Sequence, residues 1–480
     1  MKMELSRRAF LERGGAGIAA VTLGPHLFGR NFDSALAAPA PETMNLSDYL
    51  DHFNVTEKMI REILAEGLAL GGDYCDVYFQ HAVSHTIGLE DKQVNRAYSN
   101  VDLGVGIRVL KGDQTGYSFT EELTPASMKL AARTAANIAS SGNKTEPIGL
   151  AHHSLPNYYP INVPWEAVKI DQKIPYLQTI NDKVFAADPR IVKSRIYFGD
   201  STAYILFASS EGRIVCDYQP MVRINVNVTA EENGRREQNG FGLASRRGLE
   251  LLSPANVDRL ADESVRRTLE LFKAVKPEGG EMPVVLAAGG SGILLHEAIG
   301  HGMEADFNRK GQSIFSDKID KPVAQNIVTI VDDGTNPNFR GSINVDDEGN
   351  DTQKTLLVEN GILRSYLHDR ISAQFYNVKP TGNGRRQSFR FSPLPRMRNT
   401  YMLNGPHTKE EIFASVKKGL YAEYFTNGEV RIGPGDFTFY VKSGYLIEDG
   451  KITQPVKDVN IIGNGPQVLA DITMVADDFK

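Results

Sequence analysis

Apolar residues recur at helical spacing in two segments of the chain, and two further segments have a helical composition. Over 56–70 they fall at intervals of three and four residues, and Gly71 and Gly72 follow as a stop, which predicts a helix. Apolar residues on one face predict a helix over 254–274, good helix formers predict one over 125–140, and the segment 168–187 is also expected to be helical. These helices separate the segments that have the character of strands.

Short runs rich in β-branched and aromatic residues lie between the helices and predict strands. In the first half of the chain they cover 76–79, 84–89, 103–110, 191–198, 203–209, 214–218 and 223–230. Beyond residue 280, Gly and Pro are frequent and the strand-like runs cover 283–287, 326–331, 355–358 and 437–444. This order predicts an α+β fold, in which an N-terminal α/β region of two helix-and-sheet units precedes a largely β domain with one conspicuous helix.

Turn residues and composition mark the domain boundaries that we expect. A segment rich in Pro, Asn and His over 147–164 is typical of a linker, and the residues 277–280 (Pro-Glu-Gly-Gly) are typical of a boundary. We therefore expect a first α/β subdomain over 45–146, a second over 165–275 and a β-rich domain over 281–480.

Composition and charge narrow the class of protein. The 480 residues are 41% hydrophobic and 23% charged, as is usual for folded soluble chains. Lys and Arg total 53 against 59 Asp and Glu, and the net charge of -6 argues against binding to nucleic acid or to an anionic membrane. Cys75 and Cys216 are too few for a disulfide framework, so stability must come from packing.

The N-terminus has the features of an export signal. Arg7 and Arg8 stand in the sequence Ser-Arg-Arg-Ala-Phe-Leu, which resembles the twin-arginine motif, and small residues at 35–37 offer a cleavage site. The apolar run over 16–23 is far shorter than the roughly 20 residues that span a bilayer, so no stable membrane insertion is expected. We predict a twin-arginine signal peptide over 1–37 and a periplasmic or extracytoplasmic protein, with a basic N-terminal tail as the alternative.

The strongest chemical motif is His296-Glu297-x-x-x-His301, which follows a glycine-rich stretch and an apolar run. Metalloproteases with the shorter H-E-x-x-H motif place both histidines on one helix face, where they share a Zn²⁺ ion. Five residues of regular α-helix rotate by about 500°, which would leave the two imidazoles roughly 140° apart. A π-type bulge, or a helix that ends at Gly300, is therefore needed to bring His301 back.

Glu297 is next to His296, where its carboxylate can reach a water molecule without itself binding the metal. That position suits a general base, which takes a proton from the attacking water and passes it to the leaving amine. The alternative interpretation is two core or surface histidines with satisfied hydrogen bonds.

Several segments of the chain together resemble the TldD/PmbA family of zinc-dependent proteases, and in particular the TldD-type subunit. The matching segments, in order, are 104–109 with 116–117, 295–306, 395–400 and 461–466. The resemblance implies a catalytic C-terminal domain with Zn²⁺ held by His296 and His301, Glu297 as base, and cleavage of peptides or unfolded polypeptides. It also implies a dimer, formed either by two copies of this chain or with a TldE-like subunit.

The chain departs from the family pattern at the third metal ligand. In the family this ligand is a cysteine in a glycine-rich segment after the Gly-Asn-Gly-Pro sequence, which here covers 463–466, and neither Cys75 nor Cys216 corresponds to it. A catalytic zinc site normally has three protein ligands. Either the chain is truncated at its C-terminus, which we expect, or a carboxylate such as Glu304 or Asp306 replaces the cysteine. A non-catalytic peptide-binding or assembly subunit is the alternative function.

Other polar groups carry weaker signals. His81, His85, His152 and His153 lack partners at ligand-like spacing, so they are expected on the surface or in turns. The acidic segments 332–334 and 346–351 have oxygen ligands for Ca²⁺ but not the EF-hand spacing, so solvated turns are expected. Five arginines could bind a peptide carboxylate, line a cleft near the metal, lie at a subunit interface or be solvated: Arg385, Arg386, Arg390, Arg396 and Arg398.

Overall fold

The computed structural model describes residues 44–139 and 144–479. The predicted twin-arginine signal and its cleavage site lie outside these residues. The described part of the chain mixes helices and strands along its whole length, so the predicted α+β class is confirmed. In that part of the chain, no helix has both the length and the apolar character needed to cross a membrane.

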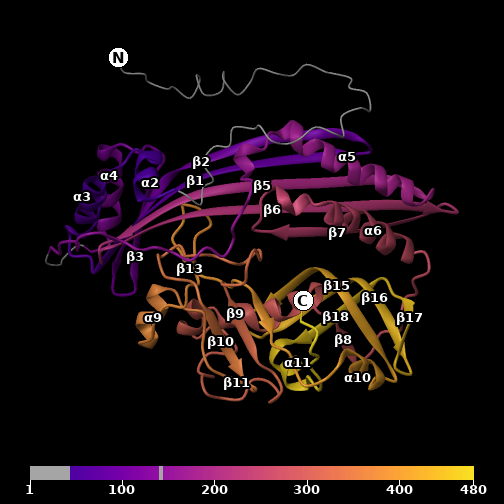
Figure 1. The fold of residues 1–480 in the computed structure, drawn as a ribbon. Coiled ribbons are helices and arrows are strands. Elements are labelled where there is room, and N and C mark those ends of the chain that lie inside the picture. Colours follow the sequence, from indigo (N-terminus) through magenta and orange to yellow (C-terminus); the bar gives the residue numbers. More distant parts are fainter. Residues whose placement is uncertain (1–43, 140–143, 480) are drawn as a thin grey trace. The chain divides into compact units, whose positions relative to one another are not determined.

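A seven-stranded sheet forms the N-terminal half of the described chain (Figure 1). Its strands run in the order β3-β2-β1-β5-β6-β4, with β7 paired to β6. The strands are β1 (Tyr74–Glu90), β2 (Gln93–Lys111), β3 (Gln114–Thr120), β4 (Ala151–His152), β5 (Ile191–Ser209), β6 (Arg213–Glu232) and β7 (Arg235–Ser245). Because β1 pairs with β5, the two predicted helix-and-sheet units contribute to one continuous sheet.

The central strands are longer than the sequence pattern predicted. The separate runs at 76–79 and 84–89 are parts of β1, which pairs without interruption with β5 from Asp76 to Glu90. The runs on either side of Gly199 and of Gln219 likewise join into β5 and β6. Polar residues interrupt the apolar pattern, but neighbouring strands on both sides satisfy the backbone hydrogen bonds there, so the strand continues.

Helices cover one face of this sheet. They are α2 (Leu46–His52), α3 (Glu57–Leu68), α4 (Pro125–Ala136), α5 (Ile170–Ala187) and α6 (Pro254–Glu270), with 3₁₀ turns η2 (Trp165–Ala167) and η3 (Leu249–Leu252). Thr56, Thr124 and Ser253 cap α3, α4 and α6 through their side-chain oxygens, which accept from backbone N–H groups of the first turn. The helix boundaries lie within a few residues of the predicted ones.

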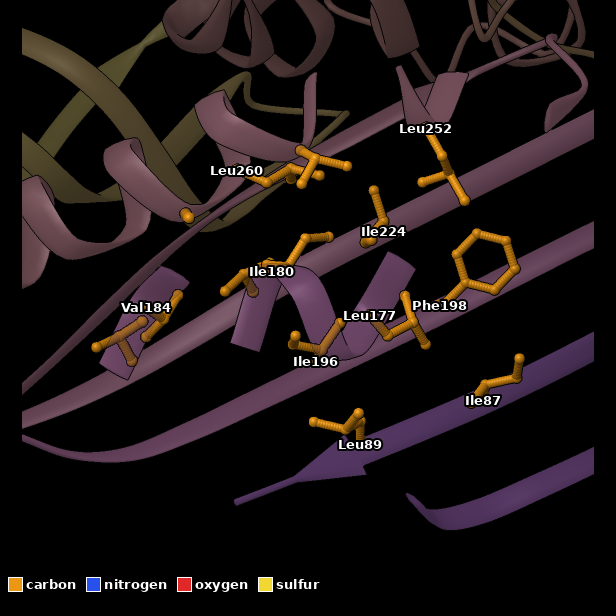
Figure 2. Close-up of a cluster of buried hydrophobic side chains, with 14 of the residues drawn as sticks. Ile87, Leu89, Leu177, Ile180, Val184, Ile196, Phe198, Ile224, Leu252 and Leu260 are labelled. Carbon is orange, nitrogen blue, oxygen red and sulfur yellow. The ribbon is translucent and has the colours of Figure 1, made fainter. Parts of the chain in front are cut away.

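The larger core lies between the sheet and the pair α5 and α6 (Figure 2). Leu177, Ile180 and Val184 of α5 lie on one side, and Leu260 of α6 joins them. Figure 2 shows these side chains directed at strand residues such as Phe198, and all of those named here are fully buried. A second core beneath α2, α3 and α4 uses the other end of the same strands.

The opposite face of the sheet contacts the C-terminal region. Successive strand residues point to opposite faces, so Val77 and Phe79 lie under the helices whereas Tyr78 points the other way. Tyr78 and Phe207 pack with Phe389 in a third cluster. This face of the sheet therefore packs against residues beyond 280.

The C-terminal region contains smaller sheets and short helices. One sheet has the order β17-β16-β15-β8 with β18 beside β16, another has the order β11-β10-β9-β14, and β12 pairs with β13. The strands are β8 (Val284–Leu286), β9 (Ile330–Asp333), β10 (Lys354–Glu359), β11 (Ile362–Leu363), β12 (Gly384–Arg385), β13 (Leu394–Pro395), β14 (Thr400–Met402), β15 (Lys418–Arg431), β16 (Asp436–Glu448), β17 (Lys451–Pro455) and β18 (Val459–Asn464). The helices outside the motif are α8 (Ala305–Arg309), α9 (Arg370–Tyr376), α10 (Lys409–Ala414) and α11 (Gly465–Asp471). The strand predicted at 326–331 starts only at Ile330.

The prediction of solvated acidic turns is wrong. Asp332 and Asp333 are 1% and 3% exposed, and Asp346, Asp347 and Glu348 are 2%, 6% and 4% exposed. The reason is a buried network that reaches the large sheet. Arg108 of β2 donates to Asp76 at 2.8 Å and to Glu348 at 2.5 Å, and Arg386 donates to Asp76 at 2.7 Å. Arg108 neutralises Glu348, whereas the buried aspartates accept hydrogen bonds from neutral side chains and backbone N–H groups. A sequence pattern cannot show these partners, because most of them come from distant segments.

Two of the histidines expected on the surface have partners instead. His85 of β1 lies 2.8 Å from Asp200 of β5, and His81 lies 2.8 Å from His52 of α2. His152 and His153 are exposed, as predicted. Pairing between strands explains the difference, because β1 carries His81 and His85 across the middle of the sheet rather than around a turn.

The core between α5, α6 and the sheet predicts how the chain responds to loss of a phenylalanine. Phe198→Ala removes a fully buried ring from this core and should lower the free energy of unfolding by about 3–5 kcal/mol. Phe375→Ala is the matched control, since Phe375 is 60% exposed and its loss should cost about 0.5 kcal/mol or less. Urea denaturation measures the free energy of unfolding of both variants. Equal urea midpoints for Phe198→Ala and Phe375→Ala would contradict the burial of Phe198 in this core.

Candidate functional site

The motif histidines lie on an interrupted helix. A 3₁₀ turn, Gly290–Gly292, leads into α7 (Ile293–Leu295), then into a π-helical turn, His296–Gly300, and a 3₁₀ turn, His301–Met303. The backbone N–H of His301 donates to the carbonyl oxygen of His296, five residues earlier. The bend that the five-residue spacing requires is therefore present, in the form of a π turn.

The π turn gathers three side chains. One ligand atom from each of His296, Glu297 and His301 lies within 4.8 Å of the other two. The two imidazole centroids are 4.7 Å apart with the rings nearly perpendicular, and Nε2 of His301 is 3.9 Å from Oε2 of Glu297. All three residues are half-buried, so a small ligand can reach them from solvent.

Packing on two sides holds this turn in place. Leu294 and Ala298 belong to the core against β15 and β16, whereas Ile299 and Met303 belong to the core against β9 and β10. A Cβ at Gly465, the first residue of α11, would lie only 2.2 Å from the carbonyl oxygen of Ala298. The π turn is thus wedged between two apolar cores and the start of α11.

Glu304 fixes the orientation of His301. Its Oε1 lies 3.2 Å from Nδ1 of His301, and its Oε2 accepts from Nη1 of Arg396 at 3.1 Å. The Glu304 side chain is 1% exposed. A proton on Nδ1, shared with Glu304, leaves the Nε2 lone pair facing Glu297, which is the arrangement that carboxylates impose on metal-binding histidines.

The protonation preferences of the three groups differ. Burial, with a smaller contribution from the nearby His301, lowers the pKa of His296 to about 4. Burial raises the pKa of Glu297, although the charge of His301 acts in the opposite direction. Burial opposes protonation of His301, but its hydrogen bond to Glu304 and the charge of that carboxylate raise the pKa of His301 overall. Burial therefore favours the neutral form of His296, in which one ring nitrogen has a lone pair available for a ligand.

This donor set fits a divalent transition metal. Two imidazole nitrogens and a carboxylate oxygen lie within 4.8 Å of one another, and these are ligands that Zn²⁺ accepts. His296 and His301 would hold the ion, with Glu297 beside it. Within the described residues Glu304 and Asp306 do not belong to this group of three, and Glu304 faces the other ring nitrogen of His301. Glu304 thus occupies the position of an orienting carboxylate rather than of a ligand.

The five arginines named from the sequence have different surroundings. Arg386 is buried against Asp76, Arg390 donates to Asp102 and Glu121, and Arg398 donates to backbone carbonyl oxygens. Arg396 lies beside the motif through Glu304, as one of the expected possibilities had it. The orienting role of Glu304 was missed, although its position three residues after His301 was a signal that could have shown it.

Family comparisons match nearly the whole described chain. The PmbA/TldA metallopeptidase domain 1 matches residues 75–139, the central domain of that family matches 163–272, and its C-terminal domain matches 279–480. The metal motif lies in the C-terminal match.

Relatives with known names are similar over most of their own length. The chain is 38% identical to the metalloprotease TldD homolog of Haemophilus influenzae over 442 residues, which cover 90% of this chain and 88% of the relative. It is 31% identical to a metalloprotease of Methanocaldococcus jannaschii (85% and 91% covered) and 27% identical to the zinc metalloprotease TldD homolog of Saccharolobus solfataricus (85% and 90% covered).

Solved structures share the fold at lower sequence identity. A Thermotoga maritima protein, described as a proposed modulator of a DNA gyrase, superposes with a TM-score of 0.75 at 20% identity, covering 88% of this chain and 95% of that one. TldE from Thermococcus kodakarensis superposes with a TM-score of 0.71 at 17% identity, covering 88% and 94%. The three domain matches and the relative that is 38% identical show that the chain belongs to the PmbA/TldA family of metallopeptidases, which is also called the TldD/PmbA family.

Proposed function

We propose that this protein is a zinc-dependent peptidase that cleaves peptides or unfolded polypeptides at the His296–His301 motif. The observation that carries the proposal is the π turn, which brings two imidazoles and a carboxylate within 4.8 Å of one another despite a spacing that an α-helix would separate. The name of the Saccharolobus solfataricus relative supports zinc as the metal.

His296 and His301 would hold the metal through ring nitrogens. Zinc at this position would act as a Lewis acid toward the scissile carbonyl and lower the pKa of water. Glu297 accepts a proton from the attacking water and passes it to the leaving nitrogen, because its carboxylate lies 3.9 Å from Nε2 of His301, beside the proposed metal position. Glu304 keeps His301 in the orientation that directs Nε2 at this point.

We further propose that the protein works as a dimer after export. A second copy of the chain and a TldE-like subunit are both suitable partners, since the TldE of Thermococcus kodakarensis has the same fold. Export by the twin-arginine route would place the protein in the periplasm or another extracytoplasmic compartment, because Arg7 and Arg8 stand in the signal-like N-terminus.

The roles within the motif can be separated by substitution. His296→Ala and His301→Ala each remove a ligand and should reduce bound zinc to a small fraction of the wild-type content. Glu297→Gln keeps the shape of the side chain but cannot accept a proton, so it should retain the wild-type zinc content while peptide hydrolysis falls by roughly 10² or more. Elemental analysis and a fluorogenic peptide assay provide the two measurements.

The exposed His152 supplies the matched control for this series, and His152→Ala should change neither property. Wild-type zinc in the His296→Ala protein would exclude the metal site. Full hydrolysis by the Glu297→Gln protein would exclude the assigned base, and a non-catalytic peptide-binding or assembly subunit would then be the better interpretation.

The contact between α11 and the π turn predicts a distant effect on metal binding. Gly465→Ala places a methyl group against the carbonyl oxygen of Ala298, so the turn must shift. Overpacking of this kind costs about 1–3 kcal/mol, and we expect weaker zinc binding although no ligand has changed. Gly292→Ala is the control, because nothing lies within 4 Å of a Cβ at Gly292. Zinc titration of both variants tests this, and equal affinities would show that the turn tolerates displacement.

Export can be tested independently of catalysis. The twin-arginine transporter recognises the arginine pair itself, so replacing Arg7 and Arg8 together by Lys should leave uncleaved precursor in the cytoplasm. Cell fractionation and the mass of the protein in each fraction measure the outcome. A shortened double variant in the periplasm would contradict the twin-arginine assignment.

A further inference from the structure

Three exposed arginines, Arg223, Arg340 and Arg385, lie close together without a carboxylate partner. Arg223 is on β6, Arg340 is in the loop after β9, and Arg385 is on β12. Most other arginines that form a polar contact in the described chain reach an acidic side chain, as Arg190 does with Asp188. Among the described residues, none of the three guanidinium groups forms an ion pair.

Backbone contacts seat Arg340 next to Arg223. In the ladder between β6 and β7, Arg223 pairs with Ala244. The next two residues of the chain hold the loop that carries Arg340: Oγ of Ser245 donates to the carbonyl oxygen of Asn338 at 2.7 Å, and the N–H of Arg246 donates to the same oxygen at 3.0 Å. The loop that carries Arg340 is therefore attached to the end of β7, next to Ala244, which is the partner of Arg223.

The same loop packs on the segment next to Arg385. A Cβ at Gly341 would lie 2.1 Å from the carbonyl oxygen of Arg398. The guanidinium of Arg398 in turn donates to the carbonyl oxygens of Gly382 at 3.1 Å and Gly384 at 3.0 Å, which lie just before Arg385. The loop thus bridges β6 and β12, and Arg340 is the middle member of the three.

The electrostatics agree with this placement. Partial burial, followed by the positive charges of Arg223 and Arg385, lowers the pKa of Arg340, and no acidic group counteracts them. Asp347, whose N–H donates to the carbonyl oxygen of Gly384 beside Arg385, already accepts from the hydroxyl of Tyr78 and the backbone N–H of Arg386. The protein therefore maintains a concentration of positive charge that it does not itself neutralise.

The short pair of strands β12 and β13 connects the three arginines to the candidate metal site. Arg385 pairs with Leu394 in β12 and β13, and the N–H of Arg396 continues the ladder by donating to Asn383 at 2.9 Å. Arg385 and Arg396 are therefore diagonal neighbours on one face of this ladder. The guanidinium of Arg396 binds Glu304, which holds His301. An anion at the three arginines would lie close to the motif.

We propose that Arg223, Arg340 and Arg385 form a subsite that binds a carboxylate of the peptide substrate. The guanidinium groups match a carboxylate in charge and in hydrogen-bond geometry, and a carboxylate of the substrate would supply the acidic partner that the three arginines lack. The carboxylate can come from the C-terminus of the peptide or from an Asp or Glu side chain. This proposal rests on the proposed peptidase function and adds a preference for acidic peptides or for peptides cut near their C-terminus.

Binding to the Glu297→Gln protein tests the subsite without requiring turnover. Three fluorescein-labelled peptides of otherwise identical neutral sequence are compared by anisotropy: one with a free C-terminus, one amidated, and one amidated with an internal Glu. We expect at least one of the two carboxylate peptides to bind about tenfold more tightly than the neutral amide. The peptide that does so identifies the source of the carboxylate, and equal affinities for all three would overturn the proposal.

Substitution then assigns the preference to these residues. Arg340→Gln and Arg385→Gln should each remove most of the tenfold difference and leave the affinity for the neutral amide unchanged. Arg61→Gln is the control, since Arg61 is an exposed arginine on α3 with no ion pair among the described residues. A preference that survives in both cluster variants would overturn the assignment.

Thermal stability separates a binding role from a structural one. Removing one of three mutually repelling charges should keep or raise the Tm of Arg340→Gln without peptide, whereas loss of a structural arginine would lower it. A lowered Tm would overturn the interpretation as an unneutralised site. If the carboxylate preference is present but no peptide is hydrolysed by the wild-type protein with zinc, the subsite stands and the peptidase function fails.

Discussion

The candidate site depends on the hydrogen bond from the N–H of His301 to the carbonyl oxygen of His296, which closes the π turn. A π turn is less favourable than the α-helix that the same residues would otherwise form, and it persists only where surrounding structure enforces it. Here Leu294 and Ile299 are buried in different cores on either side of the turn. The local conformational cost is thus offset by apolar burial, and the two histidines meet as a consequence.

A buried charge network ties this region to the large sheet. Arg108, Arg386, Asp76 and Glu348 have fully buried side chains and bond to one another. Charges removed from water in this way are costly unless they are compensated, and the two arginines here balance the two carboxylates, so removing any one of the four would leave an uncompensated charge in the interior. The network also reaches the backbone near the site, since the carboxylates of Asp346 and Asp347 accept from the N–H groups of Gly384 and Arg386. The sheet thereby positions β12, from which Arg385 extends.

The adjacent residues Arg385 and Arg386 therefore carry positive charges with different roles. Arg386 is enclosed and neutralised by Asp76, and its neighbour Arg385 is exposed without an acidic partner in the described chain. Strand geometry sends successive side chains to opposite sides, which is why adjacent arginines have such different surroundings. The first stabilises the contact between the sheet and the C-terminal region, and the second remains available for an external anion.

Local patterns were sufficient for the four long helices α3, α4, α5 and α6, for the mixed fold class and for the motif itself, whereas the short helices such as α2 and α11 were not predicted. Apolar periodicity and capping residues such as Thr56 and Ser253 act within a few residues, so they can be recognised from the sequence. The requirement for a bend between His296 and His301 also followed from helix geometry alone. By contrast, the length of β1, the burial of Asp346–Glu348 and the role of Glu304 depend on residues far apart in the chain or on packing around them. An acidic run appears solvated until distant arginines such as Arg108 are brought to it, and only the tertiary structure does that, because charge neutralisation depends on distance in space rather than on separation along the chain.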